Sequence, residues 1–141
     1  MKWTLEVVIV PVADVDRAKD FYGRQLGFAV DHDSAFGDEL RIVQLTPPGS
    51  GCSIVVGSGL TDMAPGSLDG LQLVVPDLRA ARAQLLDRGV GVSEIRVAGP
   101  WGFRSAREED SLDNAGFVFF RDPDGNRWAV QQISARAGGQ S

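Results

Sequence analysis

The feature that most constrains this chain is an internal repeat. Val12-Ala13-Asp14 is matched by Val75-Pro76-Asp77 at an offset of 63, and Leu26-Gly27 by Arg88-Gly89 at an offset of 62. In both places an apolar run precedes the aspartate, and apolar residues at helical spacing follow it. The glycine then ends the helix, because glycine readily adopts the left-handed conformation found just past a helix C-terminus. The chain is therefore expected to contain two copies of one supersecondary unit.

Each copy is predicted to have the order β-α-β-β-β, with Asp14 and Asp77 as the N-caps of the two helices. In the first copy the helix extends from Val15 to Leu26. The strands of this copy are expected at 4–12, 28–30, 39–46 and 52–56, with a turn at 32–34. The strands of the second copy are expected at 71–75, 90–97, 116–121 and 127–133. Between the last two strands, Asp122-Pro123-Asp124-Gly125-Asn126 predicts a tight turn.

These elements predict one α+β domain. The expected parts are a first module at 4–57, a linker at 58–68, a second module at 69–134 and a frayed tail at 135–141. A sheet that carries a helix on one face must also hide its other face. The two modules are therefore predicted to form a curved eight-stranded mixed sheet around a central cleft, with the helices outside. Clefts of this kind are common ligand sites.

The second module has about twelve more residues than the first, within the segment 96–114. This insertion contains Pro100-Trp101-Gly102-Phe103 and then the charged run 104–110. Long excursions in a compact domain are often functional. Two interpretations stay open: Trp101 and Phe103 form a lid or pocket wall, or they cover an edge of the sheet.

Charge and composition narrow the partners. The net charge is −5, and the bases do not cluster beyond 79–82, which disfavours nucleic acid and favours a cationic or neutral small ligand. The longest apolar run, 7–12, is far shorter than the ~20 residues of a membrane span, and no export signal is expected. A single cysteine, Cys52, allows no intrachain disulfide, which suits the expected cytoplasmic location.

Four motifs in order resemble the vicinal-oxygen-chelate superfamily, which includes glyoxalases, bleomycin resistance proteins and dioxygenases. They are Val-Pro-Val-Ala-Asp-Val-Asp-Arg-Ala-Lys-Asp-Phe-Tyr at 10–22, Gln-Leu-Gly-Phe at 25–28, Leu-Val-Val-Pro-Asp-Leu at 73–78 and Phe-Arg-Asp-Pro-Asp-Gly-Asn at 120–126. The resemblance covers residues 4–133 and implies the two-module fold. Together with the exposed sheet edges, it also favours a homodimer.

Metalloenzymes of this superfamily hold a divalent ion with His, Glu or Gln side chains from the first and last strands of each module. The resemblance places these positions at Val7, Ile54, Gly70 and Ala129. None of these side chains has a lone pair to offer a metal ion. We therefore expect no metal and no cofactor, and no glyoxalase I or extradiol dioxygenase activity. The single histidine, His32, lies in an expected turn outside these strands.

Strand alternation predicts a largely apolar cleft with a few hydrogen-bonding side chains and an aromatic cover. The predicted ligand-binding residues are Leu5, Val7, Ile9, Arg41, Ile54, Gln72, Trp101, Phe103, Ala129 and Gln131. The leading hypothesis is a protein that binds a small organic molecule, aromatic or cationic, without metal, as bleomycin resistance proteins do.

Two other functions stay open. One is an enzyme of the same superfamily, of lyase, isomerase or dioxygenase type, with acid–base groups from Asp38, Glu39, Arg41 or 104–110. The other is an atypical metal site built from Glu6, Gln72 and Gln131. The sequence contains no paired carboxylates and no histidine–nucleophile arrangement, so no catalytic residue is assigned.

Overall fold

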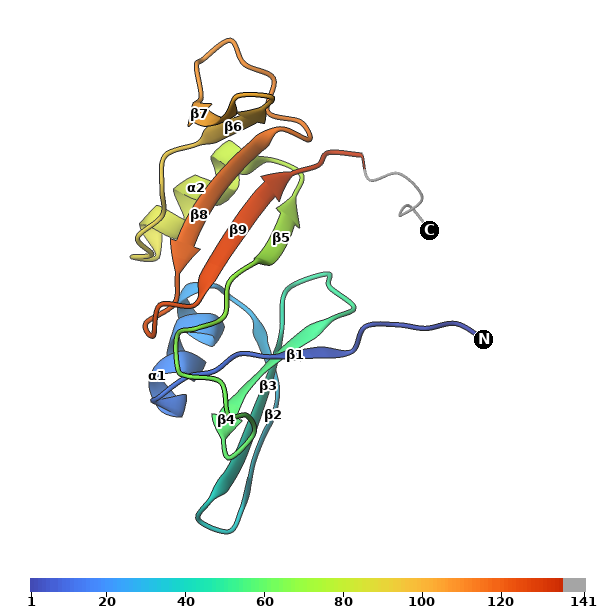
Figure 1. Ribbon diagram of the computed structural model, residues 1–141, viewed down its shortest axis with the longest axis vertical. Coiled ribbons are helices and arrows are strands. Elements are labelled where there is room, and N and C mark those ends of the chain that lie inside the picture. The colour runs from blue at the N-terminus through green and yellow to red at the C-terminus, as the bar shows by residue number, and fades with distance from the viewer. Residues whose placement is uncertain (136–141) are drawn as a thin grey trace. The chain divides into compact units, whose positions relative to one another are not determined.

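The computed structural model describes residues 1–135 and divides into two compact units (Figure 1). The first unit holds residues 1–68 together with 122–126, and the second holds 69–121 and the described residues from 127 onward. The elements of the first unit are β1 (Val7–Ile9), α1 (Val15–Asp20), the π-helix η1 (Phe21–Gln25), β2 (Ala29–Phe36), β3 (Leu40–Thr46) and β4 (Ser53–Ser58). Those of the second unit are β5 (Leu71–Val75), α2 (Leu78–Asp87), β6 (Arg96–Gly99), β7 (Gly102–Ser105), β8 (Gly116–Arg121) and β9 (Arg127–Gln132).

The first unit is a four-stranded sheet with the order β1-β4-β3-β2, in which β1 and β4 are parallel and the other neighbours antiparallel. One face of this sheet packs against the helical segment. It contributes a buried apolar layer, namely Val10, Val43, Leu45, Ile54 and Val56, which meets Ala18, Phe21 and Tyr22. Full burial of each such side chain contributes about 1.5–3 kcal/mol. The predicted cap is present, since Asp14 Oδ1 accepts a hydrogen bond from Arg17 N at 3.0 Å.

Three details of the first unit differ from the prediction. The strand expected at 4–12 is limited to the three residues of β1. The helix changes from α to π geometry at Phe21, where Leu26 N donates to Phe21 O at 3.0 Å. Apolar spacing does not distinguish these two helix types. The expected turn at 32–34 is wrong, because β2 continues through His32 to Phe36. All eight residues of this edge strand are exposed, so its sequence lacks the apolar alternation that marks a half-buried strand.

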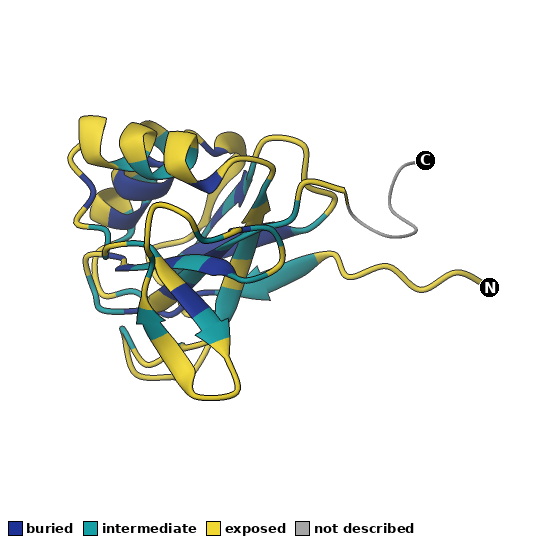
Figure 2. Ribbon diagram, turned by 90° about the horizontal axis from the view of Figure 1, so that it is seen from above, coloured by how far each residue is buried: buried dark blue, intermediate teal, exposed yellow. Residues whose placement is uncertain are grey.

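The second unit repeats this arrangement. Its sheet has the order β5-β9-β8-β6-β7, with β5 and β9 parallel and the remaining neighbours antiparallel. The helix α2 covers one face, and the buried apolar residues on that side are Leu78, Val90, Val118, Phe120, Trp128 and Val130. Figure 2 shows that buried residues gather on the strands and on the inner sides of the helices. The α+β class and the repeated module are therefore confirmed.

The insertion accounts for the difference between the two sheets. It contributes the hairpin of β6 and β7, so the described residues form sheets of four and five strands, one strand more than the eight predicted. Most of the strand expected at 90–97 is absent, since only Val92 makes an isolated bridge, to Phe120, before β6 begins. No helix in residues 1–135 is long and apolar enough to span a membrane.

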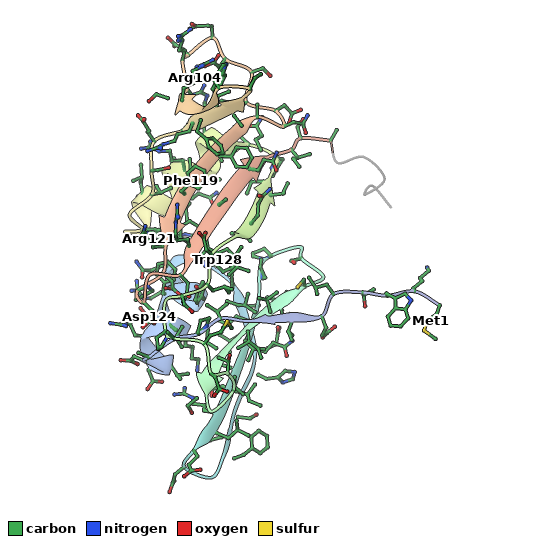
Figure 3. The ribbon with its side chains drawn as sticks, in the orientation of Figure 1. Met1, Arg104, Phe119, Arg121, Asp124 and Trp128 are labelled. Atoms are coloured by element: carbon green, nitrogen blue, oxygen red, sulfur yellow. The ribbon has the colours of Figure 1, made fainter. Side chains whose placement is uncertain are left out.

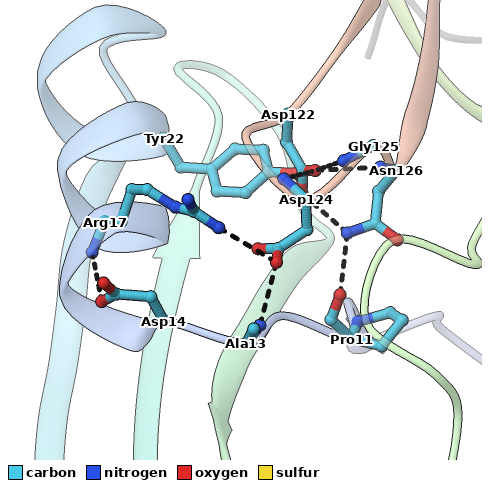
Figure 4. Close-up of polar contacts among 9 residues, drawn as sticks. All are labelled: Pro11, Ala13, Asp14, Arg17, Tyr22, Asp122, Asp124, Gly125 and Asn126. Atoms are coloured by element: carbon cyan, nitrogen blue, oxygen red, sulfur yellow. Dashed lines mark hydrogen bonds and ion pairs between the residues drawn. The ribbon is translucent and has the colours of Figure 1, made fainter.

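The turn at 122–126 belongs to the first unit and forms a buried polar cluster there (Figure 4). Asp122 Oδ1 accepts hydrogen bonds from the backbone N atoms of Asp124, Gly125 and Asn126 at 2.9–3.0 Å. Tyr22 donates its hydroxyl to Asp122 Oδ2 at 2.7 Å, and Asn126 Nδ2 donates to Pro11 O at 2.8 Å. The predicted tight turn is therefore present, and its side chains satisfy buried backbone groups.

Candidate ligand-binding site on the second sheet

The face of the second sheet that is turned away from α2 differs in chemistry from the core face. Register partners in a sheet share a face, and three such pairs between β8 and β9 define this one: Phe117 with Gln131, Phe119 with Ala129, and Arg121 with Arg127. The intervening residues, among them Val118 and Trp128, belong to the core face. We call the face of these three pairs the open face; Figure 3 shows Phe119 and Arg121 along β8.

Two adjoining hollows lie at this sheet. The smaller has a volume of about 140 Å³ and is lined by Asp69, Gly70, Leu71, Phe119, Arg127, Trp128 and Ala129. The larger has a volume of about 590 Å³ and is lined by Gly91, Ser93, Arg96, Phe103, Phe119, Phe120, Arg121 and Arg127. Phe119 and Arg127 line both. The volume of the larger hollow lies within the range of small-molecule sites.

Small residues at two positions leave the smaller hollow open. Gly70 has φ +99°, and a Cβ built on it would meet nothing within 4 Å. Ala129 lies beside it on β9. Both are positions that the resemblance assigns to metal ligands, and neither a methyl group nor a hydrogen atom can coordinate a cation. These residues do not fit the superfamily's metal, and residues 1–135 contain no group of three or more His, Cys, Asp or Glu side chains placed to hold one.

An aromatic cluster borders the larger hollow. Phe103 packs edge-to-face on both Phe117 and Phe119, with ring centroids 5.4 Å apart in each case. About half of the Phe103 side chain remains exposed. Phe103 is therefore part of the wall of the larger hollow.

Trp101 lies on the opposite face of the β6–β7 hairpin from Phe103. A Cβ built on Gly99 would come within 2.4 Å of the Trp101 ring, whereas Phe103 is the register partner of the preceding residue, Ala98. The Arg104 guanidinium lies 5.0 Å from the Trp101 ring centroid and pairs with Asp110 at 2.8 Å. This pairing holds the pKa of the Asp110 carboxyl well below its ordinary value. Trp101 therefore belongs to an ion-paired surface cluster and lines neither hollow.

The two predicted glutamines meet on the open face. Gln72 Nε2 donates to Gln131 Oε1 at 2.6 Å, and Gln131 Nε2 donates to Asn114 O at 2.9 Å. The amides are therefore fixed in orientation beside Ala129, and neither lines a hollow.

The predicted residues of the first unit lie on two different faces. Val7 and Ile9 share the face turned away from α1 and are half-buried, and Leu5 precedes β1 and is 70% exposed. Ile54 is the register partner of Val8 and is only 4% exposed, so it belongs to the core face. A shift of one residue in register exchanges the two faces of a strand, which explains why the sequence placed Ile54 with Val7.

Arg41 also lies on the helix side of its sheet. Its guanidinium pairs with Asp16 of α1 at 2.8 Å and with Asp33 of β2 at 3.0 Å. The hydrogen bonds from Arg41, and then from Lys19, hold the pKa of Asp33 well below its ordinary value. Arg41 therefore has a structural role, and the sequence wrongly placed it in the ligand site.

The acid–base residues considered for an enzyme do not gather at either hollow. Asp38 and Glu39 lie at the turn between β2 and β3 in the first unit, and His32 lies on the exposed strand β2. Among the residues of 1–135 that line the two hollows, Asp69 is the one acidic residue.

Three arginines that sequence reasoning missed line the larger hollow, namely Arg96, Arg121 and Arg127. A signal for two of them was present. The alternation Phe117, Phe119, Arg121 and the alternation Arg127, Ala129, Gln131 put the arginines on the face of the predicted Ala129 and Gln131.

A sequence profile of the Glyoxalase/Bleomycin resistance protein/Dioxygenase superfamily matches residues 4–130, and the chain therefore belongs to this superfamily. No curated protein sequence gives a significant match.

Solved structures support the same assignment. The chain is similar to TnmS3, an antibiotic binding protein from Streptomyces sp. CB03234, with 34% identity, a TM-score of 0.72 and coverage of 94% of this chain and 98% of TnmS3. A glyoxalase/bleomycin resistance protein from the same organism is also 34% identical, with a TM-score of 0.69 and coverage of 92% and 100%. A superfamily member from Sphaerobacter thermophilus DSM 20745 is 26% identical, with a TM-score of 0.73 and coverage of 93% and 98%.

Proposed function

We propose that this protein binds a small aromatic molecule on the open face of its second sheet, without using a metal ion. The observation that carries the proposal is the pair of hollows that adjoin at Phe119, beside the small residues Gly70 and Ala129. The similarity to a protein described as antibiotic binding supports a binding role over a catalytic one.

The proposed contacts account for modest affinity. A flat ring packed on Phe119 and Phe103 gains about 0.5–1.5 kcal/mol per aromatic pair beyond its area burial. Burying about 200 Å² of apolar surface at ~25 cal/mol/Å² contributes about 5 kcal/mol. The gross gain is then about 6–8 kcal/mol, and the cost of association offsets part of it, so we expect dissociation constants weaker than micromolar, toward the millimolar range.

The test is a thermal-shift screen of aromatic antibiotics and metabolites against the wild type and Ala129→Phe. The larger side chain fills the smaller hollow, so a compound that raises the melting temperature of the wild type should lose most of that effect. Ala83→Phe is the matched control, because Ala83 is exposed on α2. The proposal fails if no compound stabilises the wild type, or if Ala129→Phe and Ala83→Phe respond alike.

We also propose that the protein acts as a cytoplasmic homodimer. The half-buried free thiol of Cys52 is compatible with a reducing compartment. The edge strand β2 is exposed along its length and offers a pairing surface. Light scattering coupled to gel filtration measures the mass, and a monomer at micromolar concentration would contradict the dimer.

A further inference from the structure

We infer that the larger hollow recognises a negatively charged group, so that the bound molecule is an organic anion with a flat apolar part. This inference rests on the proposed function and specifies the chemical class of its ligand. It is carried by the three arginines of the open face.

The register of the strands brings these arginines together. Arg121 and Arg127 are direct partners across β8 and β9, and Arg96 is the partner of Phe117 on the next strand. All three belong to the face that carries Phe119, and all three line the larger hollow. The positive charges therefore surround one space that also has aromatic walls.

The arrangement is unfavourable without an anion. Like charges directly opposite each other in an antiparallel pair destabilise the sheet, and Arg121 faces Arg127. Within residues 1–135, the guanidinium groups of Arg96 and Arg121 make no hydrogen bond or ion pair, although both residues pair through their backbones. The single partner of Arg127 is Asp69 at 3.3 Å, with both side chains more than half exposed. A bound anion would relieve this repulsion.

Four arginines elsewhere in residues 1–135 have close counterions. Arg17, Arg24, Arg41 and Arg104 pair with aspartates at 2.8–3.1 Å. The chain carries a net charge of −5, so acidic partners are abundant. Their absence from the lining of the larger hollow gives it the opposite sign to the whole molecule. The cationic ligand expected from the net charge therefore does not fit this site.

The ligand chemistry follows from the two kinds of wall. A guanidinium offers a planar fork of N–H donors that matches a carboxylate, sulfonate or phosphate group. Phe103 and Phe119 offer ring faces and edges for a flat apolar body. A molecule with both parts satisfies the hollow, whereas inorganic phosphate alone satisfies only the arginines.

The experiment compares two fluorescent probes that differ mainly in one charged group. 1-Anilinonaphthalene-8-sulfonate carries a sulfonate, and N-phenyl-1-naphthylamine is its neutral counterpart. We expect the sulfonate probe to bind the wild type about ten-fold more tightly at low salt, and this advantage to shrink in 0.5 M NaCl because salt screens exposed charges.

Variants locate the effect. Arg121→Gln and Arg127→Gln should each weaken the sulfonate probe by about three- to ten-fold and change the neutral probe by less than two-fold. Arg121→Lys should retain part of the preference, since it keeps the charge and loses the fork. Arg79→Gln, on the exposed side of α2, is the matched control and should change neither probe.

The outcomes separate the two claims. Equal affinity for both probes, with loss of both in Ala129→Phe, would overturn the anion inference and leave the proposed function standing. Equal losses of both probes in the Arg→Gln variants would also overturn the inference. If neither probe nor any compound of the thermal-shift screen binds, both claims fail.

Discussion

The buried turn at 122–126 makes a sharp prediction about stability. Asn126 is fully buried, and its side chain forms three hydrogen bonds: to Pro11 O at 2.8 Å, to Asp122 Oδ2 at 2.7 Å, and from Leu68 N at 3.0 Å. Asn126→Ala removes all three and leaves Leu68 N without a partner, whereas Pro11 O keeps the hydrogen bond from Gly66 N at 3.0 Å. The orphaned buried group costs about 1–3 kcal/mol, and the two other lost hydrogen bonds add to this cost, so we expect a loss of about 4 kcal/mol in the free energy of unfolding.

Tyr22→Phe supplies an internal comparison. It removes one hydrogen bond to Asp122 Oδ2, which still accepts from Asn126 Nδ2, so its expected cost is smaller, about 1.5–2 kcal/mol. Gln84→Ala on the exposed side of α2 is the matched amide control and should cost less than ~0.5 kcal/mol. These three values should therefore rank in the order of bonds lost.

Urea unfolding followed by tryptophan fluorescence measures the three variants. Trp128 is 3% exposed and reports on loss of the core, whereas Trp3 and Trp101 are already exposed. The comparison requires that the free energy of unfolding falls with urea concentration at the same slope in each variant as in the wild type. A changed slope indicates a changed unfolded or native ensemble. The reasoning is refuted if Asn126→Ala costs less than about 1 kcal/mol, or less than Tyr22→Phe.

Three further predictions follow from single contacts. Gly66→Ala should cost at least ~2 kcal/mol in a melting experiment, because φ is +81° and the new Cβ would lie 2.0 Å from a backbone carbonyl oxygen. Hydrogen bonds from Arg41 and Lys19 hold the pKa of Asp33 below its ordinary value of 3.8. The stabilisation that they provide is complete above pH 3.8 and is lost as the pH falls below it. Urea unfolding between pH 6 and 2 should therefore show a smaller acid-induced loss in the free energy of unfolding for Arg41→Gln than for the wild type. In probe titrations, Phe103→Ala should weaken binding several-fold and Trp101→Ala by less than two-fold, and the reverse order would contradict the assignment of faces.

Local sequence signals account for most of the fold. Asp14 and Asp77 cap their helices by accepting a hydrogen bond from a backbone N–H of the first turn. Both caps can be predicted from the sequence without long-range information, because apolar residues at helical spacing follow each aspartate. The strand β2 was partly missed for the opposite reason. It is an edge strand whose pairing with β3 is set by tertiary context, so its exposed residues carry no periodic signal.

The candidate site was harder to predict because it depends on register. Ala129 and Gln131 were placed on the open face because they alternate within one strand, and the structure puts Phe119 and Gln72 beside Ala129. Ile54 and Arg41 were assigned to the wrong face, since their strands had to be aligned across a loop, where an error of one residue inverts the result.

The charge of the site shows a second limit of reasoning from composition. A net charge is a sum over the whole surface, and here the excess of acids lies elsewhere, while Arg96, Arg121 and Arg127 line one hollow. The register of the strands shows which charged residues face each other, and the net charge does not contain this information. A chain of net charge −5 can therefore present a basic hollow, and our proposal of an anionic ligand rests on the lining residues and not on the net charge.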